Sequence, residues 1–237
     1  MAEKNNSEEW YEESYGSSGF NAQRLYPNEE LLRFFGRNYF FLSAAKRKDT
    51  KVLEIGCGSC SNLWMIDHEG FDAHGIDLSS QGIKLGNKML ENWGGQAKLR
   101  VANMTDLPYQ DIFFDVVVDV FSSYCLNESE FDLCLSEVQR VLKPGGRFFT
   151  YTPGKRSDAF LNHCPAKLID NSTLSGIYRE GSPFEGNHYP FRFVDSEQYK
   201  SCIEKFGFQV DYLESVQRSY FHQNEIFEHV VAEGVKL

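Results

Sequence analysis

The stretch VLEIGCGSCSNL, residues 52–63, places two glycines at the end of an apolar run and an acid two residues before the first glycine. The run KVLEI, residues 51–55, predicts a buried strand. Gly56 and Gly58 predict a tight turn whose backbone can come close to a ligand, and the helix expected next presents free N–H groups. Glu54 suits a cationic group at this turn and repels a pyrophosphate.

Strands and helices alternate from this turn onward. Short apolar runs predict strands over 51–55, 71–77, 97–103, 113–121 and 147–152, and three-to-four spacing predicts the helices between them. A helix over 196–207 and strands over 208–215 and 226–235 follow. Because parallel strands need right-handed crossovers, we expect an α/β fold. We expect a doubly wound, seven-stranded Rossmann-like sheet that is mostly parallel, with one antiparallel strand near the C-terminus. In such a sheet, ligands bind beyond the carboxyl ends of the strands.

Charge and composition narrow the class of partner. The chain has 237 residues and a formal net charge of −10, with no block of Lys and Arg, so we expect no nucleic-acid partner. No basic segment leads into an apolar stretch and no apolar run is long enough for a bilayer, which predicts a cytoplasmic protein without a membrane partner. Cys57 and Cys60 form a C-x-x-C without a second pair or nearby histidines, so we expect no metal site.

Other nucleotide-binding motifs fit the turn less well. The dinucleotide fingerprint G-x-G-x-x-G requires glycine where this chain has Ser61, and the G-K-S or G-K-T of a phosphate-binding loop is absent. A nicotinamide-dependent oxidoreductase therefore stays an alternative, in which the pyrophosphate of the cofactor must bind beside both Glu54 and Ser61.

The pattern E-x-G-x-G, formed by Glu54, Gly56 and Gly58, resembles the first motif of class I S-adenosylmethionine-dependent methyltransferases, of the small-molecule, type 11-like kind. FDVVVDVFSSYCL, from residue 114, resembles the fourth motif, and EVQRVLKPGGRFFTYTP, from residue 137, resembles the helix, Pro-Gly-Gly turn and fifth strand of the family. The similarity covers about residues 50–153 and implies S-adenosylmethionine as the cofactor.

The resemblance also implies roles for individual residues. Asp77 matches the acid that holds both ribose hydroxyls, a task that suits the two acceptor oxygens of a carboxylate. Asn103 stands where an acid commonly reads the adenine amino group, and the N–H of Met104 could serve adenine N1. The full set of expected cofactor-binding residues is Glu54, Gly56, Cys57, Gly58, Asp77, Leu78, Asn103, Met104, Asp119 and Phe121.

Two segments lie outside the shared pattern, as acceptor-binding regions of this family usually do. We expect residues 1–45 to form an aromatic-rich cap or lid, and residues 46–237 to form the methyltransferase domain with an acceptor-site insertion at 154–195. Candidates for the lid are Tyr11, Tyr15 and Arg24. If the acceptor must lose a proton, His188 and His163 in the insertion are the candidate bases.

The motifs for base, glutamine and arginine methylation and for metal-dependent catechol methylation are missing. We therefore expect methyl transfer to a small molecule, with an oxygen of a natural product or sugar-like metabolite as the first choice. Transfer to a small amine and a non-catalytic S-adenosylmethionine-binding protein are the alternatives. We expect a monomer or homodimer.

Overall fold

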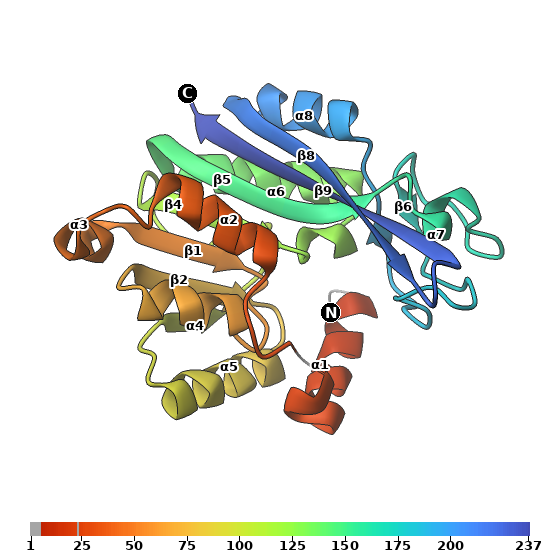
Figure 1. Cartoon of the computed structure of the whole chain (residues 1–237), viewed down its shortest axis with the longest axis horizontal. Helices are drawn as coiled ribbons and strands as arrows, with labels where there is room; N and C mark the ends of the chain where they lie inside the picture. Colours follow the sequence, from red (N-terminus) through yellow and green to blue (C-terminus); the bar gives the residue numbers. More distant parts are fainter. Residues whose placement is uncertain (1–5, 23) are drawn as a thin grey trace.

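A seven-stranded sheet forms the centre of the computed structural model, which describes residues 6–22 and 24–237 (Figure 1). Its strands are β1 Lys51–Ile55, β2 Asp72–Asp77, β3 Lys98–Val101, β4 Phe114–Val120, β5 Leu142–Gly154, β8 Phe208–Tyr220 and β9 Glu225–Lys236. Their order is β3-β2-β1-β4-β5-β9-β8, and β9 runs antiparallel to both of its neighbours, β5 and β8. The predicted fold class is confirmed.

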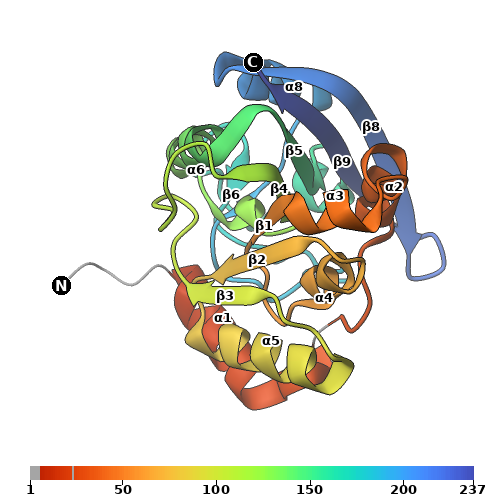
Figure 2. The ribbon, with the colours of Figure 1, turned by 90° about the vertical axis from the view of Figure 1, so that its left-hand side faces the viewer.

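Helices cover both faces of the sheet (Figures 1 and 2). The helices α2 Glu29–Asn38, α4 Ser61–His68 and α5 Ser80–Trp93 pack on one face, and α6 Glu128–Val141 and α8 Ser196–Lys205 pack on the other. Neighbouring residues of β1 show why two cores form, because successive side chains of a strand point to opposite faces. Val52 joins the core under α2 and α4, whereas Leu53 joins the core under α6 and α8.

Local signals fix the helix starts. The Ser79 side chain accepts a hydrogen bond from the N–H of Gly82 and so caps the start of α5. Asn127 and Glu130 form a capping box at the start of α6. None of the described helices is both long and apolar enough to cross a membrane.

The two segments outside the alternation also contain regular structure. The N-terminal part holds α1 Asn6–Ser18, η1 Gly19–Ala22, α2 and the short α3 Ala44–Asp49. The insertion holds α7 Asp158–Leu161 and the paired strands β6 Thr173–Leu174 and β7 Phe191–Arg192. Whereas α2 packs onto one face of the sheet, α1 lies beside α5, near the carboxyl ends of β1 and β2 (Figures 1 and 2). Among the described residues of the predicted N-terminal region, α1 and Arg24 lie where a lid would be needed.

Candidate active site

Glu54 lies at the carboxyl end of β1 and is almost fully buried, with 1% of its surface exposed. Its Oε1 accepts a hydrogen bond of 2.7 Å from the side-chain amide of Asn62, which in turn accepts one of 2.8 Å from the N–H of Asn28. Its Oε2 is buried and has no hydrogen-bond partner among the described residues. Burial raises the pKa of Glu54 to about 8, although the Asn62 hydrogen bond and the nearby Arg24 oppose the shift.

Protein side chains lie directly against both glycines of the turn. A Cβ added to Gly56 would lie 2.3 Å from the Cβ of Ser122, and one added to Gly58 would lie 2.6 Å from the hydroxyl of Tyr15. Both glycines also have positive φ angles, of +68° and +48°. The turn therefore requires glycine for its conformation and for the close approach of its neighbours.

Asp77 ends β2 beside this turn. One carboxylate oxygen accepts a hydrogen bond of 2.8 Å from the N–H of Gly58, and the other accepts one of 2.8 Å from the N–H of Ser79. Burial raises the pKa of Asp77, and these two hydrogen bonds oppose the shift. Because a carboxylate oxygen has two lone pairs, each oxygen of Asp77 can accept once more from a ligand.

The two candidates for reading adenine, Asn103 and Met104, follow the carboxyl end of β3. Asn103 is exposed, and its side-chain oxygen accepts a hydrogen bond of 3.0 Å from the N–H of Thr105. Asn103 and Met104 line the same cavity as Glu54 and Asp77. The structure thus brings the adenine-reading candidates to the expected edge.

Asp119 is buried behind the cavity and does not line it. Its carboxylate accepts hydrogen bonds from the N–H groups of Ser122 and Ser123, both at 3.1 Å, and from their hydroxyls. The oxygens of Asp119 thus hold the loop after β4, and its direct contact with the cofactor stays a prediction. Phe121 in that loop does line the cavity.

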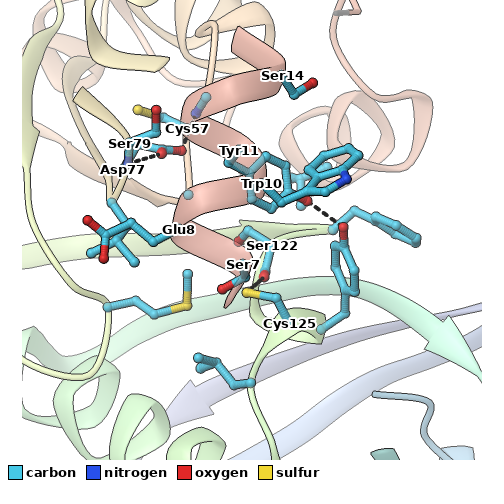
Figure 3. A pocket seen from close by; sticks show the side chains of 18 of the residues that line it. Ser7, Glu8, Trp10, Tyr11, Ser14, Cys57, Asp77, Ser79, Ser122 and Cys125 are labelled. Carbon is cyan, nitrogen blue, oxygen red and sulfur yellow. Dashed lines mark hydrogen bonds between the residues drawn. The ribbon is translucent and has the colours of Figure 1, made fainter. Parts of the chain in front are cut away.

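The cavity has a volume of about 810 Å³ and lies at the carboxyl ends of β1, β2, β3 and β4, under α1 and the insertion. The sequence-predicted residues that line it are Tyr11, Tyr15, Arg24, Glu54, Gly56, Cys57, Gly58, Asp77, Leu78, Asn103, Met104 and Phe121. Figure 3 shows α1 crossing this cavity, with Trp10 and Tyr11 on one side of the helix and Asp77 and Ser79 on the other.

Several residues that line this cavity were not predicted from the sequence. The most prominent are Trp10, Asn62, Ser122, Tyr124, Phe184 and Tyr189. Tyr189 directly follows the predicted His188, so the segment was identified but not the side chain that points inward. No sequence motif predicts a role for Asn62. Its side chain contacts Glu54 because α4 packs beside β1.

The structure brings neither predicted histidine to the cavity. His188 is exposed and stacks on the ring of Tyr178, with 5.1 Å between the ring centroids. His163 is half-buried, with its Nδ1 2.8 Å from the carbonyl oxygen of Phe160. Both therefore lie where they cannot take a proton from a molecule in the cavity.

Acidic residues dominate the charge of the cavity. Within residues 6–22 and 24–237, its lining includes five carboxylates and one basic side chain, Arg24. The carboxylates are Glu8, Glu54, Asp77, Glu130 and Glu185. This balance disfavours an anionic ligand and favours a cationic one.

Comparisons with known proteins agree with this geometry. Residues 52–146 match the methyltransferase domain family. The chain is 33% identical over 114 residues to the sterol 4-C-methyltransferase strm-1 of Caenorhabditis elegans, which covers 47% of this chain and 33% of that protein. It is 34% identical over 134 residues to a fatty-acid O-methyltransferase of Mycolicibacterium smegmatis, which covers 55% of this chain and 47% of that protein. The chain thus matches a third to a half of the length of these relatives.

The fold is also similar to that of a solved S-adenosylmethionine-dependent methyltransferase from Methanosarcina mazei. The TM-score is 0.68 at 22% identity, and the alignment covers 89% of this chain and 99% of the other.

The fold and the acid-and-glycine turn define a Rossmann-like domain with an acidic cavity at the carboxyl ends of its strands. The family match identifies residues 52–146 as a methyltransferase domain, and the chain is similar to S-adenosylmethionine-dependent methyltransferases of class I. The cofactor of this class is S-adenosylmethionine.

Proposed function

We propose that this protein transfers a methyl group from S-adenosylmethionine to a small-molecule acceptor, with an oxygen of a natural product or sugar-like metabolite as the first candidate. The observation that carries the proposal is Oε2 of Glu54, which is buried at the glycine turn without a hydrogen-bond partner among the described residues. A buried carboxylate oxygen without a partner is costly, and an ammonium group is the partner it fits best.

Each end of the cofactor has a candidate partner in the cavity. Glu54 would hold the ammonium of the amino acid tail, and Asp77 would accept hydrogen bonds from the ribose hydroxyls. The side chain of Asn103 and the N–H of Met104 would read adenine. When bound, the cofactor supplies a methyl carbon that its sulfonium already activates.

The chain's own contribution is alignment and the exclusion of water. Tyr11 and Tyr15 of α1 line the cavity, and Glu12 on the same helix accepts hydrogen bonds from the hydroxyl of Ser80 at 2.6 Å and the N–H of Gln81 at 3.2 Å. These contacts support a lid role for α1, the part of the predicted cap that lies over the cavity.

A small amine is the second candidate acceptor. The five carboxylates and single arginine of the cavity, together with aromatic side chains such as Trp10, Phe184 and Tyr189, favour a cationic group. The name of the fatty-acid O-methyltransferase among the relatives supports oxygen as the methylated atom, whereas a fatty acid itself is an anion, which the acidic lining of this cavity disfavours.

Calorimetric titration with S-adenosylhomocysteine and with NADH tests the cofactor, and transfer of tritiated methyl from S-adenosylmethionine to metabolite extracts tests the reaction. We expect binding of S-adenosylhomocysteine only, and label in the extract. Binding of NADH alone would replace the proposal with an oxidoreductase. Binding of S-adenosylhomocysteine without any transfer would support a non-catalytic binding protein instead.

A cytoplasmic location, the absence of a nucleic-acid partner and a monomeric or homodimeric state stay predictions from the sequence.

A further inference from the structure

Three tyrosine hydroxyls meet in the wall of the cavity. Tyr11 comes from α1, Tyr124 from the loop after β4 and Tyr189 from the insertion, and all three line the cavity. The hydroxyl oxygens of Tyr124 and Tyr189 are 2.7 Å apart, those of Tyr11 and Tyr189 are 3.2 Å apart, and Tyr11 and Tyr124 are also hydrogen-bonded. Residues far apart in the sequence thus form a closed ring of three hydroxyls, which we call the tyrosine cluster.

The hydrogen-bond count of this cluster determines what it can offer a ligand. A hydroxyl has one hydrogen to donate and two lone pairs. In a closed ring each hydroxyl donates to one neighbour and accepts from the other. One lone pair on each oxygen remains, so the cluster as a whole is a hydrogen-bond acceptor.

Burial keeps the cluster neutral. It raises the pKa of Tyr189 to about 12 and the pKa values of Tyr11 and Tyr124 well above their ordinary value. Repulsion between the negative charges that neighbouring tyrosines of the cluster would carry raises the pKa values of Tyr11 and Tyr124 further. None of the three side chains is a phenolate near neutral pH. The cluster can therefore accept a hydrogen bond from a ligand, but it does not act as a base that removes the proton.

The surroundings favour the same kind of ligand. The ring of Trp10 lies 5.4 Å from that of Tyr189, and the ring of Phe121 lies 4.6 Å from that of Tyr124, measured between centroids. These aromatic faces can accommodate an apolar or cationic group. Within the described chain, Arg24 is the one basic side chain in the cavity lining, and it lies near Glu54, on the cofactor side.

We propose that the tyrosine cluster is the acceptor-positioning site, and that it selects an uncharged or cationic acceptor whose methylated atom carries a hydrogen, an N–H or an O–H. Carboxylate and phosphate acceptors are excluded, because they have no hydrogen to give the cluster and they meet the carboxylates of the cavity. This inference rests on the proposed function, since it names the acceptor class of the same cavity.

The first test sorts acceptors by charge. A metabolite extract is separated by ion exchange at pH 7 into anionic, neutral and cationic pools, and each pool is incubated with the protein and tritiated S-adenosylmethionine. We expect label in the neutral or cationic pool. Label confined to the anionic pool would overturn the inference and leave the proposed function standing. Label in no pool would overturn both.

The second test uses variants that each lack one tyrosine hydroxyl, with the metabolite pool that becomes labelled in the first test as the acceptor. Tyr124→Phe and Tyr189→Phe should each lower kcat/KM for the acceptor about tenfold, as expected when one hydrogen-bonding group is lost. S-adenosylhomocysteine affinity should stay within about twofold of the wild type, because the cluster hydroxyls hydrogen-bond to one another and not to Glu54 or Asp77. Tyr178→Phe is the matched control, since Tyr178 belongs to the insertion but does not line the cavity.

Thermal unfolding separates a binding defect from a folding defect. Tyr11→Phe supplies a third variant whose side chain is only partly buried, so its loss disturbs the core least. Unchanged acceptor kinetics in all three cluster variants, with normal unfolding temperatures, would overturn the inference. Weaker binding of S-adenosylhomocysteine together with unchanged acceptor kinetics would overturn it as well, because the cluster would then serve the cofactor.

Discussion

Gly56 and Gly70 share a left-handed backbone but have different neighbours. Gly56 has a φ of +68° and lies against Ser122, whereas Gly70 has a φ of +90° and no atom within 4 Å of an added Cβ. The first glycine therefore serves both conformation and close packing, and the second serves conformation alone. A left-handed backbone is a requirement of many turns, whereas the lack of a side chain at Gly56 is a requirement of its contact with Ser122.

Alanine substitutions at these two glycines should differ in cost. Gly70→Ala should lower the free energy of unfolding by about 1 kcal/mol, the usual strain of a left-handed alanine. Gly56→Ala should lower it by about 2–4 kcal/mol, because the new methyl group also overlaps Ser122. Urea denaturation measures both values. Equal losses would show that the contact between Gly56 and Ser122 is not needed.

Among the elements, α1 joins the two halves of the cavity. Its Tyr15 contacts the glycine turn, its Tyr11 belongs to the tyrosine cluster, and its Glu12 binds the start of α5. A carboxylate at a helix N-terminus is favourable because of the free N–H groups and the helix dipole. One helical turn therefore connects the proposed cofactor site to the proposed acceptor site.

Glu12 offers a specific test of this element. Glu12→Gln should increase the dissociation rate of S-adenosylhomocysteine about three- to tenfold, the range for weakening one or two hydrogen bonds. Glu13→Gln is the matched control, because Glu13 is exposed on the same helix. Stopped-flow displacement measures the rates. The same rate in wild type and Glu12→Gln would make α1 a packing element and not a lid.

The regular elements were predictable from the sequence, and the cavity wall was predictable only in part. Strands such as β1 and β4 are short apolar runs, so local periodicity is enough to place them. Tyr189 lies in an irregular segment and Tyr124 in the three-residue 3-10 helix η2 Ser123–Cys125, and neither is long enough or regular enough for a period to show which side chain points inward. For the same reason the prediction chose His188, which faces away, over its neighbour Tyr189.

At the scale of the whole molecule, the site follows from the topology. The acids Glu54 and Asp77 lie on neighbouring parallel strands, so their carboxyl ends meet at one edge. The N-terminal helix and the insertion then close over that edge (Figure 1). Motif spacing predicted the cofactor side, whereas the acceptor side depends on contacts between distant segments such as α1 and the insertion.

The buried acid also makes the stability of the ligand-free protein depend on pH. The pKa of Glu54 is about 8 in the folded chain and about 4.3 in an unfolded one. Between these values the folded state binds the extra proton, so this residue's contribution to stability is full below about pH 4.3 and decreases as the pH rises to about 8. The free energy of unfolding of wild type should therefore fall relative to Glu54→Gln between about pH 5 and pH 8. Urea denaturation across this range measures the difference, and a constant difference would contradict the assigned pKa.

We propose that Glu54 receives the ammonium of S-adenosylmethionine as a carboxylate. Isothermal titration calorimetry with S-adenosylhomocysteine at pH 7, in phosphate and in Tris, measures the protons exchanged on binding. We predict the release of about one proton per ligand from Glu54, and almost none with Glu54→Gln or with 5′-methylthioadenosine, which lacks the amino acid tail. No proton release by the wild type, or equal release by Glu54→Gln, would contradict the account.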